Sequence, residues 1–119
     1  MVMIVAVGVF FAGMGLYALA APALLLRPFG LVPGEATARA EVRAVYGGFG
    51  LAMAAILGYA AVTPGQLRTG IIITVAAALA GMALGRIISG LIDGPTSFYP
   101  NWFYCLVEAA AAGGMISVA

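Results

Sequence analysis

Four long apolar runs occupy most of this chain and limit what it can fold into. They cover approximately Val2–Leu26, Val42–Val62, Gly70–Ile92 and Asn101–Ala119. A run of about 20 apolar residues is long enough to cross the hydrocarbon core of a bilayer as a helix. The runs are continuous rather than alternating, which excludes a β-barrel, and helices satisfy their own backbone polar groups in lipid. We therefore expect an all-α, polytopic integral membrane protein, an antiparallel bundle of four transmembrane helices.

The composition supports this interpretation. Of the 119 residues, 65% are hydrophobic and 8% are charged, whereas soluble domains average about 25% charged residues. We expect one membrane domain over residues 1–119, with helices at about 2–26, 34–62, 70–92 and 101–119. The second helix is expected to begin before the membrane, because Pro33-Gly34-Glu35 resembles a helix start and Glu35 and Arg39 have ion-pair spacing. The first run lacks the basic segment of a signal peptide, so we expect it to be a retained span.

Charge and cysteine content exclude several kinds of function. The formal net charge is +1, with five arginines and no lysine or histidine. No basic stripe suggests nucleic acid, so we expect none as a partner. The single Cys105 excludes an internal disulfide and a multi-cysteine metal site, and the lack of histidine removes the usual zinc and haem ligand sets. We predict no metal site and name no cofactor; a bound pigment or quinone needs no such ligands.

Two charged residues lie deep inside the third and fourth runs. Arg86 precedes Asp93, at the end of the third run, by seven residues, and Glu108 follows Asn101, at the start of the fourth, by seven residues. At 1.5 Å of rise per residue, both lie about 10 Å below the same membrane interface. Intramembrane charges usually face the protein interior and have a partner. We therefore predict a buried, bidentate ion pair between Arg86 and Glu108.

Helical spacing places further polar residues near this pair. The faces defined by three- and four-residue spacing predict a polar pocket, open towards one surface, lined by Arg43, Tyr46, Arg86, Ser89, Asp93, Tyr104 and Glu108. Arg39 lies on the same stripe as Arg43, and Glu41 points away from it. Counting Arg39, arginines outnumber acids on these faces, which favours an anionic or carbonyl-bearing ligand. The alternative is structural: a buried Arg–Glu pair can fix helix register, and tyrosine hydroxyls can complete its network.

Small and aromatic residues predict how the helices pack. Small residues recur at four-residue spacing, at Gly81, Gly85 and Ser89 on the third span and at Ala110 and Gly114 on the fourth. This spacing lets helix backbones approach closely, and we favour packing within the bundle over dimerisation. An interfacial aromatic belt is the favoured interpretation of Phe98, Tyr99, Trp102 and Tyr104.

Two short motifs resemble a known family. These are Arg39-x-Glu41-x-Arg43-Ala44-x-Tyr46-Gly47-Gly48 and Gly85-Arg86-x-x-Ser89-x-x-x-Asp93-Gly94, the second followed by Glu108. They resemble an uncharacterised family of small bacterial four-helix membrane proteins, classed as a domain of unknown function. The resemblance implies a four-helix membrane bundle and a linked set of residues, namely Arg39, Glu41, Arg43, Tyr46, Arg86, Asp93 and Glu108. It brings no known activity.

The location follows from this resemblance and from the distribution of arginines. We expect a multi-pass protein of the bacterial inner membrane. The first loop contains Arg27, Arg39 and Arg43, against Arg68 in the second. The positive-inside rule therefore favours the first and third loops in the cytoplasm and both termini outside.

Three functions compete at this point. The first is binding or transport of a small lipophilic or anionic molecule in the polar pocket. The second is a structural or accessory role in a homo-oligomer or larger membrane complex, which smooth Gly/Ala-rich helices suit. A lipid-acting enzyme is third, because Asp93 and Glu108 are the only plausible acidic pair and lie at different depths. Small multidrug transporters share the size and a buried glutamate, but theirs lies in the first helix, so this is an analogy only.

Overall fold

The computed structural model describes all residues 1–119 and consists of helices and their connections, with no strand. The elements are α1 (Val2–Ala20), α2 (Pro22–Leu26), η1 (Arg27–Phe29), α3 (Ala36–Val42), η2 (Arg43–Gly48), α4 (Phe49–Ala61), α5 (Gln66–Asp93), η3 (Phe98–Trp102) and α6 (Phe103–Ser117). The predicted all-α class is confirmed. Three helical stretches are long and apolar enough to cross a membrane, namely Val2–Ala20, Ala36–Ala61 and Gln66–Asp93.

The first apolar run forms two helices rather than the single helix predicted over 2–26. Helix α1 ends at Ala20, and Ala21 has the non-helical angles φ −143° and ψ 67°. Pro22 causes the break, because proline has no N–H to donate and its ring disfavours the helical conformation of the preceding residue. Pro22 instead occupies the first turn of the short helix α2, where proline is well tolerated.

The other boundaries differ less from the sequence-based ranges. Helices α3, η2 and α4 form one continuous stretch, Ala36–Ala61, in which η2 is a wider turn. Helix α5 begins at Gln66, four residues before the predicted start, and ends at Asp93. Gly65 and Gly94, with φ of 112° and 86°, flank it on either side. Glycine adopts such positive φ angles without the steric cost that other residues meet.

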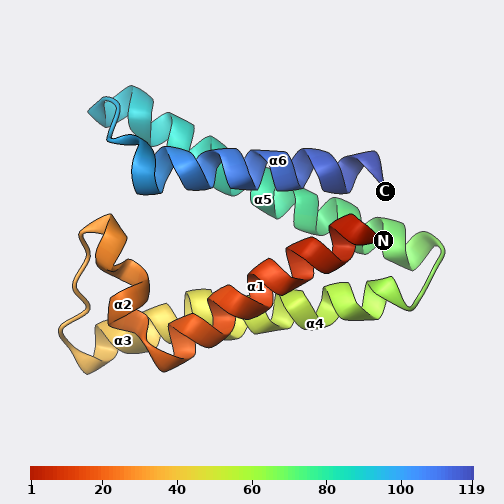
Figure 1. Cartoon of the computed structure of the whole chain (residues 1–119), viewed down its shortest axis with the longest axis horizontal. Coiled ribbons are helices and arrows are strands. Elements are labelled where there is room, and N and C mark those ends of the chain that lie inside the picture. The colour runs from red at the N-terminus through yellow and green to blue at the C-terminus, as the bar shows by residue number, and fades with distance from the viewer.

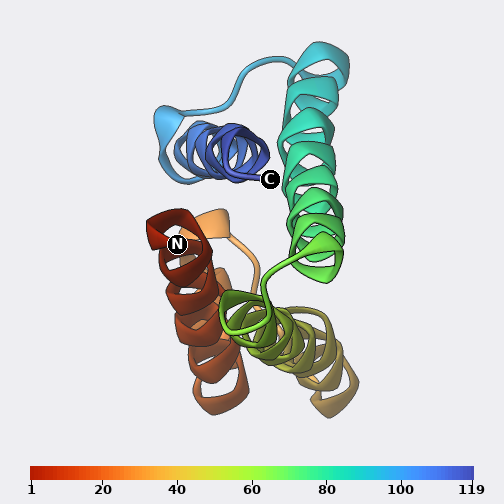
Figure 2. The same cartoon turned by 90° about the vertical axis from the view of Figure 1, so that its right-hand side faces the viewer.

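The helices pack as two hairpins that converge at one end of the molecule. Helix α1 packs along α4, and α5 packs along α6. The two pairs approach each other at the end that carries both termini and diverge towards the other end (Figure 1). Viewed from the converging end, the ends of α1 and α6 lie close to each other (Figure 2). The hydrophobic core lies at this end and contains Ile4, Val7, Phe11, Leu57, Ile72, Val75, Ala76, Leu79, Ala112 and Met115.

Glycines bring α1 and α4 into close contact. A Cβ atom on Gly15 would lie 2.8 Å from the carbonyl oxygen of Gly47, and one on Gly50 would lie 3.0 Å from the carbonyl oxygen of Phe11. The expected small-residue packing therefore occurs mainly at a different interface. On α5, Gly81 and Gly85 face open space, because a Cβ atom added to either would have no neighbour within 4 Å.

At the diverging end, α2 and η1 fold back between the two hairpins. Ala18, Leu26 and Val42 form a small second core that holds α2 against α1 and α3. Segment η1 contacts η3, which precedes α6. The first connection is thus an ordered cover over the space between the hairpins, and this space contains the candidate site.

Candidate ligand-binding site

Arg86 and Glu108 form the predicted ion pair between α5 and α6. Arg86 Nε donates to Glu108 Oε1 at 2.8 Å, and Arg86 Nη2 donates to Glu108 Oε2 at 3.1 Å. A third donor, Nη1, lies 3.3 Å from Oδ1 of Asn101. The Glu108 side chain is 2% exposed and that of Arg86 is 23% exposed. The bidentate geometry confirms that the two residues lie level on adjacent helices.

Two neighbouring aromatic rings lie beside the guanidinium group. Arg86 Cζ lies 5.9 Å from the ring centroid of Phe29 and 5.8 Å from that of Tyr104. The rings of Phe29 and Tyr104 are themselves stacked, with centroids 5.7 Å apart and an angle of 27° between their planes. A cation at this distance from an aromatic ring is attracted by its quadrupole. The first connection, through Phe29, therefore contacts the ion pair of the second hairpin.

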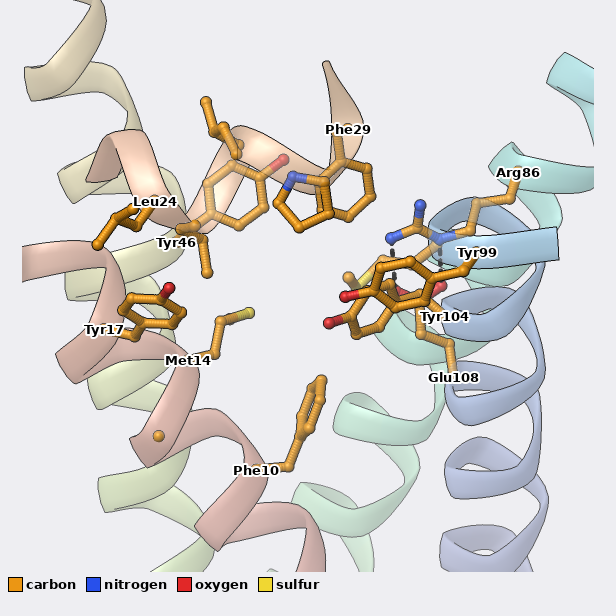
Figure 3. A pocket seen from close by; sticks show the side chains of 15 residues that line it. Phe10, Met14, Tyr17, Leu24, Phe29, Tyr46, Arg86, Tyr99, Tyr104 and Glu108 are labelled. Atoms are coloured by element: carbon orange, nitrogen blue, oxygen red, sulfur yellow. Dashed lines mark hydrogen bonds and ion pairs between the residues drawn. The ribbon is translucent and has the colours of Figure 1, made fainter. Parts of the chain in front are cut away.

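A cavity of about 340 Å³ lies beside this arrangement. Its volume is at the lower end of the range of about 300–1,000 Å³ typical of small-molecule sites. Figure 3 shows Tyr17, Met14 and Leu24 on one wall and Tyr99, Tyr104 and the Arg86–Glu108 pair on the opposite wall. The lining residues are Phe10, Gly13, Met14, Tyr17, Leu24, Leu25, Leu26, Pro28, Phe29, Tyr46, Met82, Arg86, Tyr99, Tyr104 and Glu108.

The cavity is mainly apolar, with a few polar groups gathered on its walls. Eleven of its fifteen lining residues are hydrophobic. The Glu108 carboxylate offsets the charge of Arg86, so the excess of positive charge expected from the sequence is absent from the lining. Arginine has five N–H donors, and Glu108 and Asn101 accept bonds from Nε, Nη1 and Nη2. The Tyr17 and Tyr46 hydroxyls make no hydrogen bond within the chain. They can therefore donate or accept hydrogen bonds with a bound molecule.

The predicted site residues divide into two groups. Four of them, Tyr46, Arg86, Tyr104 and Glu108, line the cavity together. The other five lie outside the lining and are Arg39, Glu41, Arg43, Ser89 and Asp93. Glu41 is exposed on α3, and Ser89 and Asp93 are exposed towards the end of α5.

The arginines outside the cavity bind backbone carbonyl groups. Arg43 Nε donates to the carbonyl oxygen of Leu19 at 3.0 Å, near the end of α1. Arg39 Nη1 donates to the carbonyl oxygens of Gly34 at 3.1 Å and Pro33 at 3.4 Å. The expected Glu35–Arg39 ion pair does not form, since Arg86–Glu108 is the single ion pair of the structure. Leu19 lies in the last turn of α1, where carbonyl groups have no partner within the helix, so a cationic side chain binds there readily.

An arginine also binds backbone carbonyl groups at the opposite end of the molecule. Arg68 Nε donates to the carbonyl oxygen of Ala60 at 2.9 Å, and its Nη2 donates to that of Ala61 at 2.8 Å. Both carbonyls belong to the last turn of α4. Arg68 therefore links the start of α5 to the end of α4, across the connection between the two hairpins.

Sequence reasoning did not find the residues that α1 and the first connection contribute to the cavity. Phe10, Gly13, Met14 and Tyr17 lie on one face of α1 at helical spacing. Tyr17 is the only polar side chain in the first span, and this could have indicated that α1 contributes to a polar site. Pro22 was another, because the break it causes places the residues from Leu24 to Phe29 over the cavity. Tyr99, expected only in an aromatic belt, also lines the cavity, beside the predicted Tyr104.

Comparison with known proteins identifies the family. Residues 1–118, almost the entire chain, match the family model described as a domain of unknown function, DUF4345. The chain belongs to the DUF4345 family. This confirms the expected membership of an uncharacterised family. Neither the curated proteins nor the solved structures gave a match to this DUF4345 chain.

Proposed function

We propose that this DUF4345 protein binds a small, uncharged amphipathic molecule in the cavity beside Arg86 and Glu108. The observation that carries the proposal is the combination of an apolar cavity with a neutralised ion pair and unbonded tyrosine hydroxyls on its walls. Ligand sites are typically apolar with a few placed polar groups. Burying an isolated anion here is unfavourable, because Glu108 already neutralises Arg86 and the anion would have no cation to pair with.

We further infer that the chain crosses the bacterial inner membrane four times. Helix α6 is the fourth span: it packs along α5, and Glu108 is its only charged residue. Its 15 residues rise about 22 Å, and η3 extends it towards the interface. In this arrangement the first and third connections, which flank the cavity, lie in the cytoplasm, in agreement with the arginines near the first connection.

Three probes with one chain length and different head groups test the charge preference. The purified protein in mild detergent is mixed with n-octanol, octanoate or octylamine, and bound molecules are counted by native mass spectrometry. We expect n-octanol to bind and the two charged probes to bind more weakly. Preferential binding of octanoate, or no binding of any probe, would overturn the proposal.

Two glycine variants locate the binding. In Gly13→Leu the new side chain projects into the cavity from α1, and nothing lies within 4 Å of its first carbon, so the backbone need not move. The matched control is Gly81→Leu on α5, which is equally open but outside the cavity. We expect Gly13→Leu to lose n-octanol binding and Gly81→Leu to retain it. Equal binding by the two variants would place the probe elsewhere.

An accessory role in a membrane complex is a second candidate. The open faces of Gly81 and Gly85 on α5 support it, since exposed glycines at four-residue spacing suit close packing of another helix. Purification in mild detergent distinguishes the two candidates. An accessory subunit should migrate with a defined complex that Gly81→Leu disrupts, whereas a self-sufficient binding protein should migrate alone.

A further inference from the structure

A second cavity lies next to the candidate site, along the seam between α1 and α6. Its volume is about 170 Å³, and all seven of its lining residues are hydrophobic. Met3, Ala6 and Val7 line it from α1, and Val107 and Ala111 line it from α6. No polar side chain reaches it, so it offers nothing to a head group and suits hydrocarbon alone.

Phe10 lines both cavities. It stands on α1 between the residues of the second cavity, Met3 to Val7, and those of the candidate site, Gly13 to Tyr17. Its ring is packed edge-on against Phe11 on the same helix, with centroids 5.7 Å apart. Phe10 is the one residue that lines both cavities. Because side chains change rotamer far faster than helices move, a rotation of Phe10 could join the two spaces without a shift of the backbone.

The two cavities lie one after the other along α1, so the combined site is elongated and its two ends differ in polarity. From Met3 to Tyr17 there are 14 residues, and a helix rises about 21 Å over that distance. One end carries the ion pair and the tyrosines, and the other end is purely apolar. A compact ligand would leave the apolar end unused.

We propose that the ligand is a single-chain amphiphile, with an uncharged polar head beside Arg86 and Glu108 and a hydrocarbon tail that passes Phe10 into the second cavity. This inference rests on the proposed function, because it places the head group in the same site. It adds the chemical class of the ligand, a long aliphatic alcohol or a molecule of similar shape. In this arrangement the Phe10 side chain separates the two cavities and changes rotamer to let the tail pass.

Competition between n-octanol and n-hexadecanol tests the tail. The two probes share a head group, and both are offered to the purified protein in the same detergent, with bound molecules counted by native mass spectrometry. We expect n-hexadecanol to bind about tenfold more tightly, a difference of about 1.4 kcal/mol. Binding of n-octanol with no preference for the longer chain would overturn the tail assignment and leave the proposed function standing. Failure of both alcohols to bind would overturn both.

Substitutions at three positions test where the tail lies. Ala111→Phe fills the second cavity from α6, and Ala109→Phe adds the same ring to an exposed position of that helix. We expect Ala111→Phe to reduce n-hexadecanol binding to the level of n-octanol, with n-octanol binding unchanged, and Ala109→Phe to alter neither. Should Ala111→Phe fail to fold, Ala111→Leu fills the space more gently. Phe10→Ala removes the side chain between the two cavities and should strengthen n-hexadecanol binding. If neither Ala111→Phe nor Phe10→Ala changes n-hexadecanol binding, the inference is refuted.

Discussion

Gly15 of α1 and Gly47 of η2 lie so close that their backbones touch. A Cβ atom on Gly15 would be 2.8 Å from the carbonyl oxygen of Gly47 and 2.9 Å from the amide nitrogen of Leu51. Both neighbours are backbone atoms, which cannot turn aside as a flexible side chain can. The contact holds α1 and α4 together just beside the cavity wall formed by Met14 and Tyr17.

We predict that Gly15→Ala destabilises the protein. The added methyl group overpacks the helix crossing, which typically costs about 1–3 kcal/mol. Thermal unfolding in detergent, followed by circular dichroism, measures the change. Gly58→Ala on α4 is the control, since nothing lies within 4 Å of its new methyl group. If both variants melt at the same temperature, the close crossing is not formed.

The ion pair gives a second prediction. Glu108→Gln leaves Arg86 without its charge partner, and breaking a buried pair in this way costs about 3–5 kcal/mol. Because the Arg86 side chain is 23% exposed, we expect a value at the lower end, measured as a fall in melting temperature.

The double variant Arg86→Met with Glu108→Met separates stability from binding. A hydrophobic replacement of both partners is often neutral for stability, so we expect the melting temperature to recover. If the pair serves the ligand, Glu108→Gln and the double variant should both lose n-octanol binding. Recovery of both properties would indicate that the pair only fixes the packing of α5 on α6.

Pro22→Ala tests the cover over the cavity. Alanine removes the reason for the break at Ala21, so α1 should extend through α2 and draw Leu24 and Phe29 away from Arg86. Spin labels at Leu24→Cys and Ser97→Cys, in a Cys105→Ser background, should move apart in a pulsed electron-resonance measurement. Pro64→Ala, in the connection at the other end of the molecule, should leave that distance unchanged. A constant distance in Pro22→Ala would show that another contact bends the chain.

Cysteine accessibility tests the proposed crossing by α5 and the sides of the membrane on which the second and third connections lie. In a Cys105→Ser background, Thr96→Cys lies in the third connection and Thr63→Cys in the second. We expect a membrane-impermeant maleimide applied to intact cells to label Thr63→Cys and not Thr96→Cys, with both labelled after permeabilisation. Labelling of both in intact cells would rule out an odd number of crossings between them.

The ion pair could be predicted from the sequence because helix geometry alone fixes the depth of both residues. Arg86 is seven residues before Asp93, and Glu108 is seven residues after Asn101; adjacent antiparallel helices bring such positions level. The prediction depended on no detail of packing. The all-α class followed for a similar reason, since long apolar runs permit few alternatives.

The remainder of the site could not be predicted, because arginines have more than one way to satisfy their donors. Arg39 and Arg43 share spacing with Tyr46, yet they bind carbonyl groups near chain turns. Those acceptors exist only once Pro22 has ended α1 and the chain has turned back at Gly34. Likewise, helix spacing marks small residues on every span, and only the packed structure separates Gly15 and Gly47 from the open Gly81.

The connection Val62–Gly65 joins two hairpins that each make most of their contacts internally. Each half already holds its own pair of helices, and the two meet chiefly through side chains at the end that carries the termini. A chain divided between Pro64 and Gly65 should therefore reassemble from two co-expressed pieces. If the two pieces do reassemble, each half could in evolution acquire a new partner without changes to the other.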